Sequence, residues 1–211
     1  AGCGVHTETG EPARHNGIHR FFLAPHSHVK YVEKHIGTGK GFGIRTIDPV
    51  TEVFLEENAV LEMDTAQIGG VDRTTRKTKA TVAAGGKLLI RERILTEKEQ
   101  TADTEFEVEL NGEDSSADIV SRSVARDASR QSYVSTIVGN APCSGHSECD
   151  AIIDGTAVVD AAPKLWAHNA DAALIHEAAI GKIAGEQILK LRTLGLTEEE
   201  AEKKIIEGFL S

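Results

Sequence analysis

The residue types best suited to metal or sulfur chemistry gather in two short stretches near the end of this chain. The first is GHSEC, residues 145–149, in which a cysteine follows a histidine and a glutamate, and the second is the pair His176 and Glu177. A thiolate is a soft ligand for iron and zinc, an imidazole suits the same metals, and a carboxylate is a harder ligand. The two stretches therefore raise the question of which fold could bring them to one site.

A zinc site formed within the first stretch alone is disfavoured by its geometry. Cys143, His146 and Cys149 have the spacing C-x2-H-x2-C, but Pro142 and Gly145 oppose a helix. Along one extended strand the two cysteines stand about 20 Å apart, which is too far for them to share one ion. The ordinary alternative for Cys149 is a small buried hydrophobic side chain, the usual fate of a free cysteine.

The N-terminal histidines offer a second and weaker candidate for a metal site. His26, His28, Glu33 and His35 form H-x-H-x4-E-x-H, which is close to the first motif of the cupin metal oxygenases. His26 and His28 would share a strand face with reach to one ion. No second glycine-proline-histidine motif follows downstream, so a cupin-like metal-dependent oxygenase is the less favoured alternative.

The elements that must position these residues are mostly strands. From about residue 29 to residue 175, runs such as TEFEVEL and SYVSTIVG alternate apolar with polar side chains, the period of a strand with one buried face. Turn pairs such as Asn111-Gly112 and Asp154-Gly155 separate the runs. The pattern recurs at roughly 15 residues, with multiples near about 27, as in a coil of stacked strands. A low aromatic content, 4%, and many small residues favour the narrow interior of a β-helix over a sandwich.

The period becomes helical near the end of the chain. Apolar residues at spacings of three and four predict one helix that ends before Gly195, which suits the left-handed conformation expected there. Thr197 and Glu200 then predict a capping box at the start of a second helix.

We accordingly divide the chain into a β-helix core, residues 1–175, and a C-terminal helical segment, residues 176–211. This division places His176 and Glu177 at a strand-to-helix junction. Such a junction can direct two successive side chains to one place, which a regular strand does not.

Composition and charge exclude several classes of function. A length of 211 residues is enough for one sizeable core with an appendage, and a net charge of −10 argues against nucleic acid and anionic membranes as partners. No apolar run approaches the roughly 18 to 20 residues that span a bilayer, and no signal peptide opens the chain. Three cysteines are too few for a disulfide framework, so we expect a cytoplasmic protein. Because the chain begins with an alanine, we expect its true N-terminus to lie upstream.

Two further activities find little support in the sequence. The glycine-rich stretch at residues 37–41 lacks the spacing of the phosphate-binding loop G-x4-G-K-[ST], so any ATP hydrolysis is expected in a partner. A β-helix that binds polysaccharide stacks sugars on aromatic side chains, and Trp166, Tyr31 and Tyr133 are a thin supply.

Several motifs, in one order along the chain, resemble the SufB/SufD family of iron-sulfur cluster assembly proteins. They are YVEKHIGTG at 31–39, SRSVARDASR at 121–130, GHSEC at 145–149, Pro163, HEAAIGKI at 176–183, EQILKLRTLGL at 186–196, EEEA at 198–201 and IIEGFL at 205–210. The match covers most of the chain, and the short length resembles the compact SufB-like form found beside a dedicated ATPase subunit.

The resemblance implies a right-handed parallel β-helix with a C-terminal helical hairpin, and a role as an assembly scaffold rather than an enzyme. Cys149 matches the cysteine that receives sulfur and ligates the transient iron-sulfur cluster, and His176 and Glu177 match the family's other candidate ligands. His146 and Glu148 flank the thiol and are expected to tune its pKa or relay sulfur. The alternative within the family is a structural SufB-like subunit without a cluster site of its own.

The resemblance also implies partners. A SufC-type ABC ATPase is expected to dock on the final helices, and the contact residues we expect are Glu186, Gln187, Leu191, Arg192, Gly195 and Leu196. A complete cluster would draw ligands from a second subunit because the chain has so few cysteines, so we expect a homodimer that passes its cluster to acceptor proteins.

Overall fold

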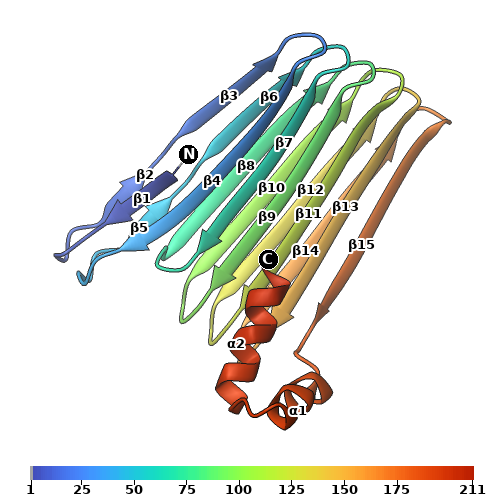
Figure 1. Cartoon of the computed structure of the whole chain (residues 1–211). Helices are drawn as coiled ribbons and strands as arrows, with labels where there is room; N and C mark the ends of the chain where they lie inside the picture. The colour runs from blue at the N-terminus through green and yellow to red at the C-terminus, as the bar shows by residue number, and fades with distance from the viewer. Residues whose placement is uncertain (1) are drawn as a thin grey trace.

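The computed structural model describes residues 2–211 and forms a parallel β-solenoid followed by two helices (Figure 1). One sheet contains, in spatial order, β1 (Gly2–His6), β4 (His28–Thr38), β7 (Val60–Ile68), β9 (Lys87–Thr96), β11 (Ser115–Ala125), β13 (Cys143–Ile153) and β15 (Ala172–Gly181). The facing sheet contains β14 (Val158–Ala167), β12 (Arg130–Gly139), β10 (Thr101–Leu110), β8 (Arg73–Val82), β5 (Arg45–Ile47) and β2 (Ala13–His15), with β6 (Val50–Leu55) beside β8 and β3 (Ile18–Leu23) beside β6. The β-helix expected from the alternating pattern is therefore confirmed.

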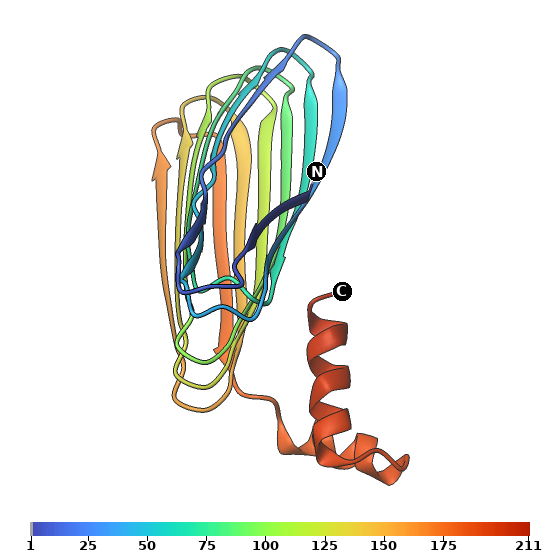
Figure 2. The ribbon, with the colours of Figure 1, turned by 90° about the vertical axis from the view of Figure 1, so that its left-hand side faces the viewer.

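Each turn of the solenoid places a strand directly on its equivalent in the turn before. Val60 pairs with Lys87, Ser115 with Cys143 and Thr101 with Arg130, so one of these coils advances the chain by 27, 28 or 29 residues. All the strand pairs of the two sheets are parallel, and the coils stack with a continuous interior between the sheets (Figure 2). The recurrence near 27 residues in the sequence is the length of this coil.

The alternation of side chains along each strand decides what enters the interior. In β8, Thr74, Arg76 and Thr78 are buried, whereas the lysines between and beyond them face outward. Lys77 and Lys79 reach Glu105 and Glu107 of the next strand at 3.4 and 2.8 Å. On the outer surface, in-register stacking thus places lysines of one strand beside glutamates of the next, and these side chains form ion pairs.

Tight corners join the strands, and they recur at equivalent positions of successive coils. Asn58, Gly85 and Asp114 all have positive φ, from 55° to 64°, and stack on one another. The amide of Asn58 donates to the carbonyl of Ala84, and the amide of Gly85 donates to the carbonyl of Glu113, each at 2.9 Å. These bonds satisfy backbone groups that a tight corner would otherwise leave without partners.

The interior is divided into an apolar part and a polar part. Leu61, Ile90 and Ile119 are among the fully buried residues of the apolar cluster. The polar part contains ionisable residues that are at most 4% exposed, namely Glu33, His35, Arg76 and Glu92. A buried charge is tolerated when it is paired and hydrogen-bonded, and these four residues supply one another's partners.

The two helices are α1 (Gly185–Thr193), which lies beyond the ends of the strands, and α2 (Glu198–Phe209), which turns back alongside the solenoid (Figures 1 and 2). Glu202 of α2 lies 4.0 Å from Arg126, which follows β11. The capping box predicted for the second helix is confirmed: the amide of Glu200 donates to the Thr197 hydroxyl at 3.2 Å, and the Thr197 amide donates to the Glu200 carboxylate at 2.8 Å. Gly195 has φ of 96° in the linker between the helices. Neither helix combines the length and apolar character needed to cross a membrane, among the residues that the structure describes.

The predicted junction at residue 176 is wrong. Strand β15 continues to Gly181, where its last residues still pair with β13, and the first helix begins only at Gly185. Residues 176–181 are favourable for a helix by composition, but the ladder to β13 keeps them extended. Tertiary pairing overrides local helix propensity here.

Candidate functional site

His176 and Glu177 lie in the middle of β15, so they face opposite sides of the sheet. His176 stands beside Ser147 of β13 and points to the interior, whereas Glu177 stands beside Glu148 and is exposed. The expectation that a junction would send both side chains to one place is therefore not met, because a regular strand alternates its side chains.

Cys149 lies on β13 and points into the interior, with only 2% of its surface exposed. It stands beside Ala178 of β15 and therefore shares the inner face with His176. Burial, followed by the negative charges of Glu92 and Asp150, raises the pKa of the Cys149 thiol to about 12. At neutral pH the side chain is a protonated thiol, and only a bound metal or an opening of the coil would make it a thiolate.

His146, Glu148 and Glu177 form a group on the outer face of the same two strands. One ligand atom from each lies within 4.8 Å of the others, and His146 Nε2 is 3.9 Å from Glu177 Oε2. The other ring nitrogen of His146 is 2.8 Å from Asp118 Oδ1 on β11. Asp118 thus fixes the ring so that Nε2 faces the two glutamates, the arrangement by which a carboxylate orients a metal-binding histidine.

The carboxylates around His146 differ in their ionisation. Burial opposes the ionisation of Asp118, but hydrogen bonds from His146 and Arg91 outweigh it and lower the pKa of Asp118. Burial and then the neighbouring Asp150 carboxyl raise the pKa of Glu148, although Arg122 and His146 counteract them. His146 therefore has beside it one firmly ionised carboxylate, Asp118, and one, Glu148, whose ionisation is opposed by burial and by the like charge of Asp150.

The predicted site residues thus separate into two sets on opposite faces of one sheet. Cys149 and His176 face inward, and Glu177 joins His146 and Glu148 outside. The groups that shift the pKa of Cys149 are Glu92 and Asp150, not His146 or Glu148, which flank it in sequence but point away. A cysteine and a histidine inside, with a histidine and two carboxylates outside, are ligand types that suit iron.

The four residues of the possible N-terminal site do not converge. His26 occupies a corner with φ of 62°, and His28 is exposed with Nε2 2.6 Å from Glu62. Glu33 and His35 point inward instead, with His35 Nε2 3.2 Å from Glu33 Oε1. The cupin-like pairing of His26 with His28 is therefore not formed, because one lies in a corner and the other begins a strand.

The residues expected to contact an ATPase lie on α1 and the linker that follows it. Four of the six are exposed, Glu186, Gln187, Arg192 and Gly195, whereas Leu191 and Leu196 are half-buried. α1 contains no buried residue, and two leucines outside the predicted set, Leu189 and Leu194, are 62% and 73% exposed.

Asp118 and two of the partners of Glu33 were not predicted from the sequence. Asp118 lies 28 residues before His146, one coil earlier, so the recurring period of the sequence contained the signal. Two of the partners of Glu33, Cys3 and His19, come from two other strands of the first coils. No local spacing connects these three residues.

A parallel solenoid with these ligand types on its last coil defines a candidate metal-sulfur protein, and comparison with known proteins gives the family. The family described as SUF system FeS cluster assembly, SufBD core domain, matches residues 4–209. The chain belongs to the SufBD family, an iron-sulfur cluster assembly family, as the motifs predicted.

Several similar proteins come from archaea. The chain is 38% identical over 117 residues to an iron-sulfur cluster assembly SufBD family protein of Methanothermobacter thermautotrophicus, which covers 54% of this chain and 28% of that protein. It is 30% identical over 204 residues to a SufBD family protein of Pyrococcus horikoshii, and the match covers 93% of this chain and 60% of that protein. It is 29% identical over 214 residues to a SufBD family protein of Archaeoglobus fulgidus, and the match covers 100% of this chain and 56% of that protein. The chain thus spans between 28% and 60% of the length of these relatives.

The burial of Cys149 predicts slow chemical modification. In the folded protein at pH 8, iodoacetamide should alkylate Cys149 at least about 100-fold more slowly than in urea, because the thiolate is both shielded and disfavoured. The rate should keep rising with pH above 9 without a plateau, since the pKa is about 12. Mass spectrometry of the peptide that contains Cys149 measures the rate, and equal rates in folded and unfolded protein would contradict this environment.

Proposed function

We propose that this chain is a scaffold subunit on which iron-sulfur clusters are assembled, together with a SufC-type ABC ATPase. The observation that carries the proposal is the crowding of candidate ligands on two adjacent strands, β13 and β15, of a SufBD-family solenoid. Cys149, His176 and Glu177 lie within two register positions of one another there. The transient cluster is cargo, passed on to acceptor proteins in the cytoplasm.

The position of β15 at the end of its sheet supports this role. Because β15 pairs with β13 alone among the strands that the structure describes, a change at this edge disturbs one ladder rather than two. Partial release of β15 would let Glu177 reach the inner face that Cys149 and His176 already share. A site that must release its cluster benefits from a ligand strand held on one side only.

The rival within the family is a structural subunit without a cluster, and the burial of Cys149 favours it. A protonated thiol that is 2% exposed cannot ligate iron unless the coil opens. The two roles differ in one measurable property, which is whether the protein holds iron and sulfide through Cys149.

Anaerobic reconstitution with iron and sulfide tests the cluster site. The wild-type protein should acquire sulfide-to-iron charge-transfer absorption, and Cys149→Ser should lose it by about tenfold or more, as removal of a principal ligand does. His176→Ala and Glu177→Gln should weaken the cluster or shorten its lifetime. Iron and sulfide analysis of the desalted protein provides the second measurement.

Matched controls separate ligand loss from damage to the fold. His168→Ala removes an exposed histidine from the same coil, and Glu109→Gln removes an exposed outward carboxylate from β10, so both should keep the cluster. Cys143→Ser should keep it as well. Undiminished iron and sulfide in Cys149→Ser would support the structural subunit instead.

We further propose a homodimer joined at the last coil. Strands β14 and β15 end their sheets, and apolar side chains are exposed on them, including Trp166 at 56% and Ile175 at 55%. An open sheet edge flanked by exposed apolar residues is a ready surface for a second chain. A second subunit there would also cover the half-open interior beside His176 and supply further ligands.

Light scattering tests the dimer. The wild-type protein at micromolar concentration should have twice the chain mass of 22.6 kDa, and Trp166→Glu should shift it toward the monomer. Phe42→Glu changes a residue that is 97% exposed in the N-terminal part and should leave the mass unchanged. A wild-type monomer would remove the argument for a shared site.

The ATPase is proposed to dock on α1 and α2. Leu189 and Leu194 expose apolar surface that the solenoid does not cover, and a helix with an uncovered apolar side is suited to a groove on a partner. Deletion of residues 183–211 should abolish co-purification with a SufC-type ATPase, and Leu189→Glu combined with Leu194→Glu should do the same. Ile18→Glu, which is 62% exposed in β3, is the matched control. Retained co-purification of the deletion variant, with its strand circular dichroism intact, would place the docking surface elsewhere.

A further inference from the structure

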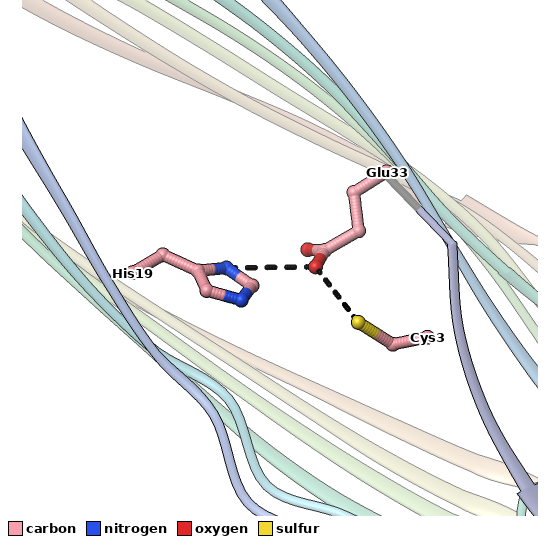
Figure 3. A group of neighbouring side chains, drawn as sticks. All are labelled: Cys3, His19 and Glu33. Atoms are coloured by element: carbon pink, nitrogen blue, oxygen red, sulfur yellow. Dashed lines mark hydrogen bonds and ion pairs between the residues drawn. The ribbon is translucent and has the colours of Figure 1, made fainter.

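Three potential metal ligands from three different strands meet inside the first coils of the solenoid. Cys3 lies on β1, His19 on β3 and Glu33 on β4, and Figure 3 shows their side chains turned toward one another. One ligand atom from each lies within 4.8 Å of the other two. The group is remote in the fold from β13 and β15, which lie at the other end of the stacked strands.

The centre of this group is one carboxylate oxygen, Glu33 Oε1. Cys3 Sγ lies 3.7 Å from it and donates a weak hydrogen bond, and His19 Nδ1 lies 3.5 Å away. The Tyr31 hydroxyl donates to the same oxygen at 3.1 Å, and His35 Nε2 is at 3.2 Å. A single oxygen atom thus gathers a thiol, two imidazoles and a phenol around it.

The Glu33 carboxylate is held in place and ionised. Burial opposes its ionisation, but His35, Arg76 and His19 outweigh that effect and lower the pKa of Glu33 to about 2. Arg76 in turn donates to His35 Nδ1 at 2.9 Å and faces Glu92 at 3.2 Å. The carboxylate is therefore a preorganised anion that does not need to lose a proton before it binds a cation.

We propose that Cys3, His19 and Glu33 form a binding site for one divalent transition metal ion of the zinc or ferrous type. Sulfur, imidazole nitrogen and carboxylate oxygen are the three donors that such ions take in proteins. Around a tetrahedral ion these donors stand roughly 3.3 to 3.8 Å apart, so side-chain shifts of about 1 Å suffice. The site does not depend on the proposed role in cluster assembly.

The group contains one buried ligand and two ligands that are partly exposed to solvent. Glu33 has 3% of its side chain exposed and anchors the site, whereas His19 has 23% exposed and Cys3 is intermediate. Three protein ligands leave a fourth position open, which is the pattern of zinc sites that also bind water or another small ligand. The Tyr31 hydroxyl, 3.3 Å from His19 Nδ1, lies beside the ligands.

Binding exchanges a proton for the ion. Burial and the adjacent Glu33 charge raise the pKa of the Cys3 thiol, so the free protein holds this proton at neutral pH. When the ion binds, the S–H bond gives way to a sulfur–metal bond and the proton leaves to solvent. Thiolate and carboxylate then balance the two positive charges of the ion.

Titration of the metal-free protein with Co²⁺ tests the site. We expect one ion per chain whose spectrum contains thiolate-to-cobalt charge-transfer absorption, a signature that the His146, Glu148 and Glu177 group cannot produce because it has no sulfur. Cys3→Ser should abolish this absorption, and His19→Gln should weaken the affinity by about tenfold or more. Zn²⁺ should displace the cobalt.

Controls distinguish this site from other ligands in the chain. Cys143→Ser, His28→Gln and Glu177→Gln should each keep the absorption. Zn²⁺ should also protect Cys3, but not Cys143, from iodoacetamide in the wild-type protein, a measurement that does not require a variant to fold. Charge-transfer absorption that persists in Cys3→Ser, or labelling of Cys3 that Zn²⁺ does not slow, would overturn the proposal.

Discussion

The position of every side chain in the solenoid follows from one constraint, the in-register stacking of parallel strands one coil apart. Because successive side chains along a strand point to opposite faces, a residue and its partners in the neighbouring coils share one face. On the outer face this alignment produces the line Arg91, Asp118, His146 and Glu177, taken from four consecutive strands of one sheet. On the inner face it sets Cys149 and His176 together. The same rule that builds the core also separates Cys149 from Glu177.

Much of the fold could be read from the sequence because the period of the strands and the length of the coil are local properties. The alternation in a run such as TEFEVEL fixes which residues are buried, and the capping box at Thr197 depends on residues three positions apart. The start of the helical segment was misplaced because that boundary is not local. The stretch after Ile175 is rich in alanine, and only its pairing with β13 keeps it extended. For the site, the sequence identified the types of ligand but not the side of the sheet on which each ligand lies. That side depends on whether His176 and Glu177 still belong to a strand, and β15 extends to Gly181.

The sequence does not predict which residues in the polar part of the interior contact one another. Glu33, His35, Arg76 and Glu92 contact one another from three strands of the two facing sheets, β4, β8 and β9, and their separations in sequence carry no shared spacing. Arg76 between two carboxylates keeps the buried charge balanced, while Ser121 and Thr104 donate to Glu92 at 3.0 and 3.4 Å. Burial lowers the pKa of His35, so a neutral ring can accept from Arg76. Removing one member would leave a buried charge unpaired, which costs more than the pair itself contributes.

The solenoid ends in a strand paired on one side at both ends, β1 at one and β15 at the other, but the two ends arrange their candidate ligands differently. The first coils close around a carboxylate that is already ionised and held by several donors, so a ligand there requires only small shifts of side chains. The last coil leaves β15 paired on one side, and it divides its candidate ligands between two faces. A cluster there requires movement of the backbone or a second chain, because a thiol and a carboxylate on opposite faces of one sheet cannot reach the same ion. Preorganised side chains in the first coils suit the proposed metal ion, whereas ligands divided between two faces at the last coil suit the proposed transient cluster.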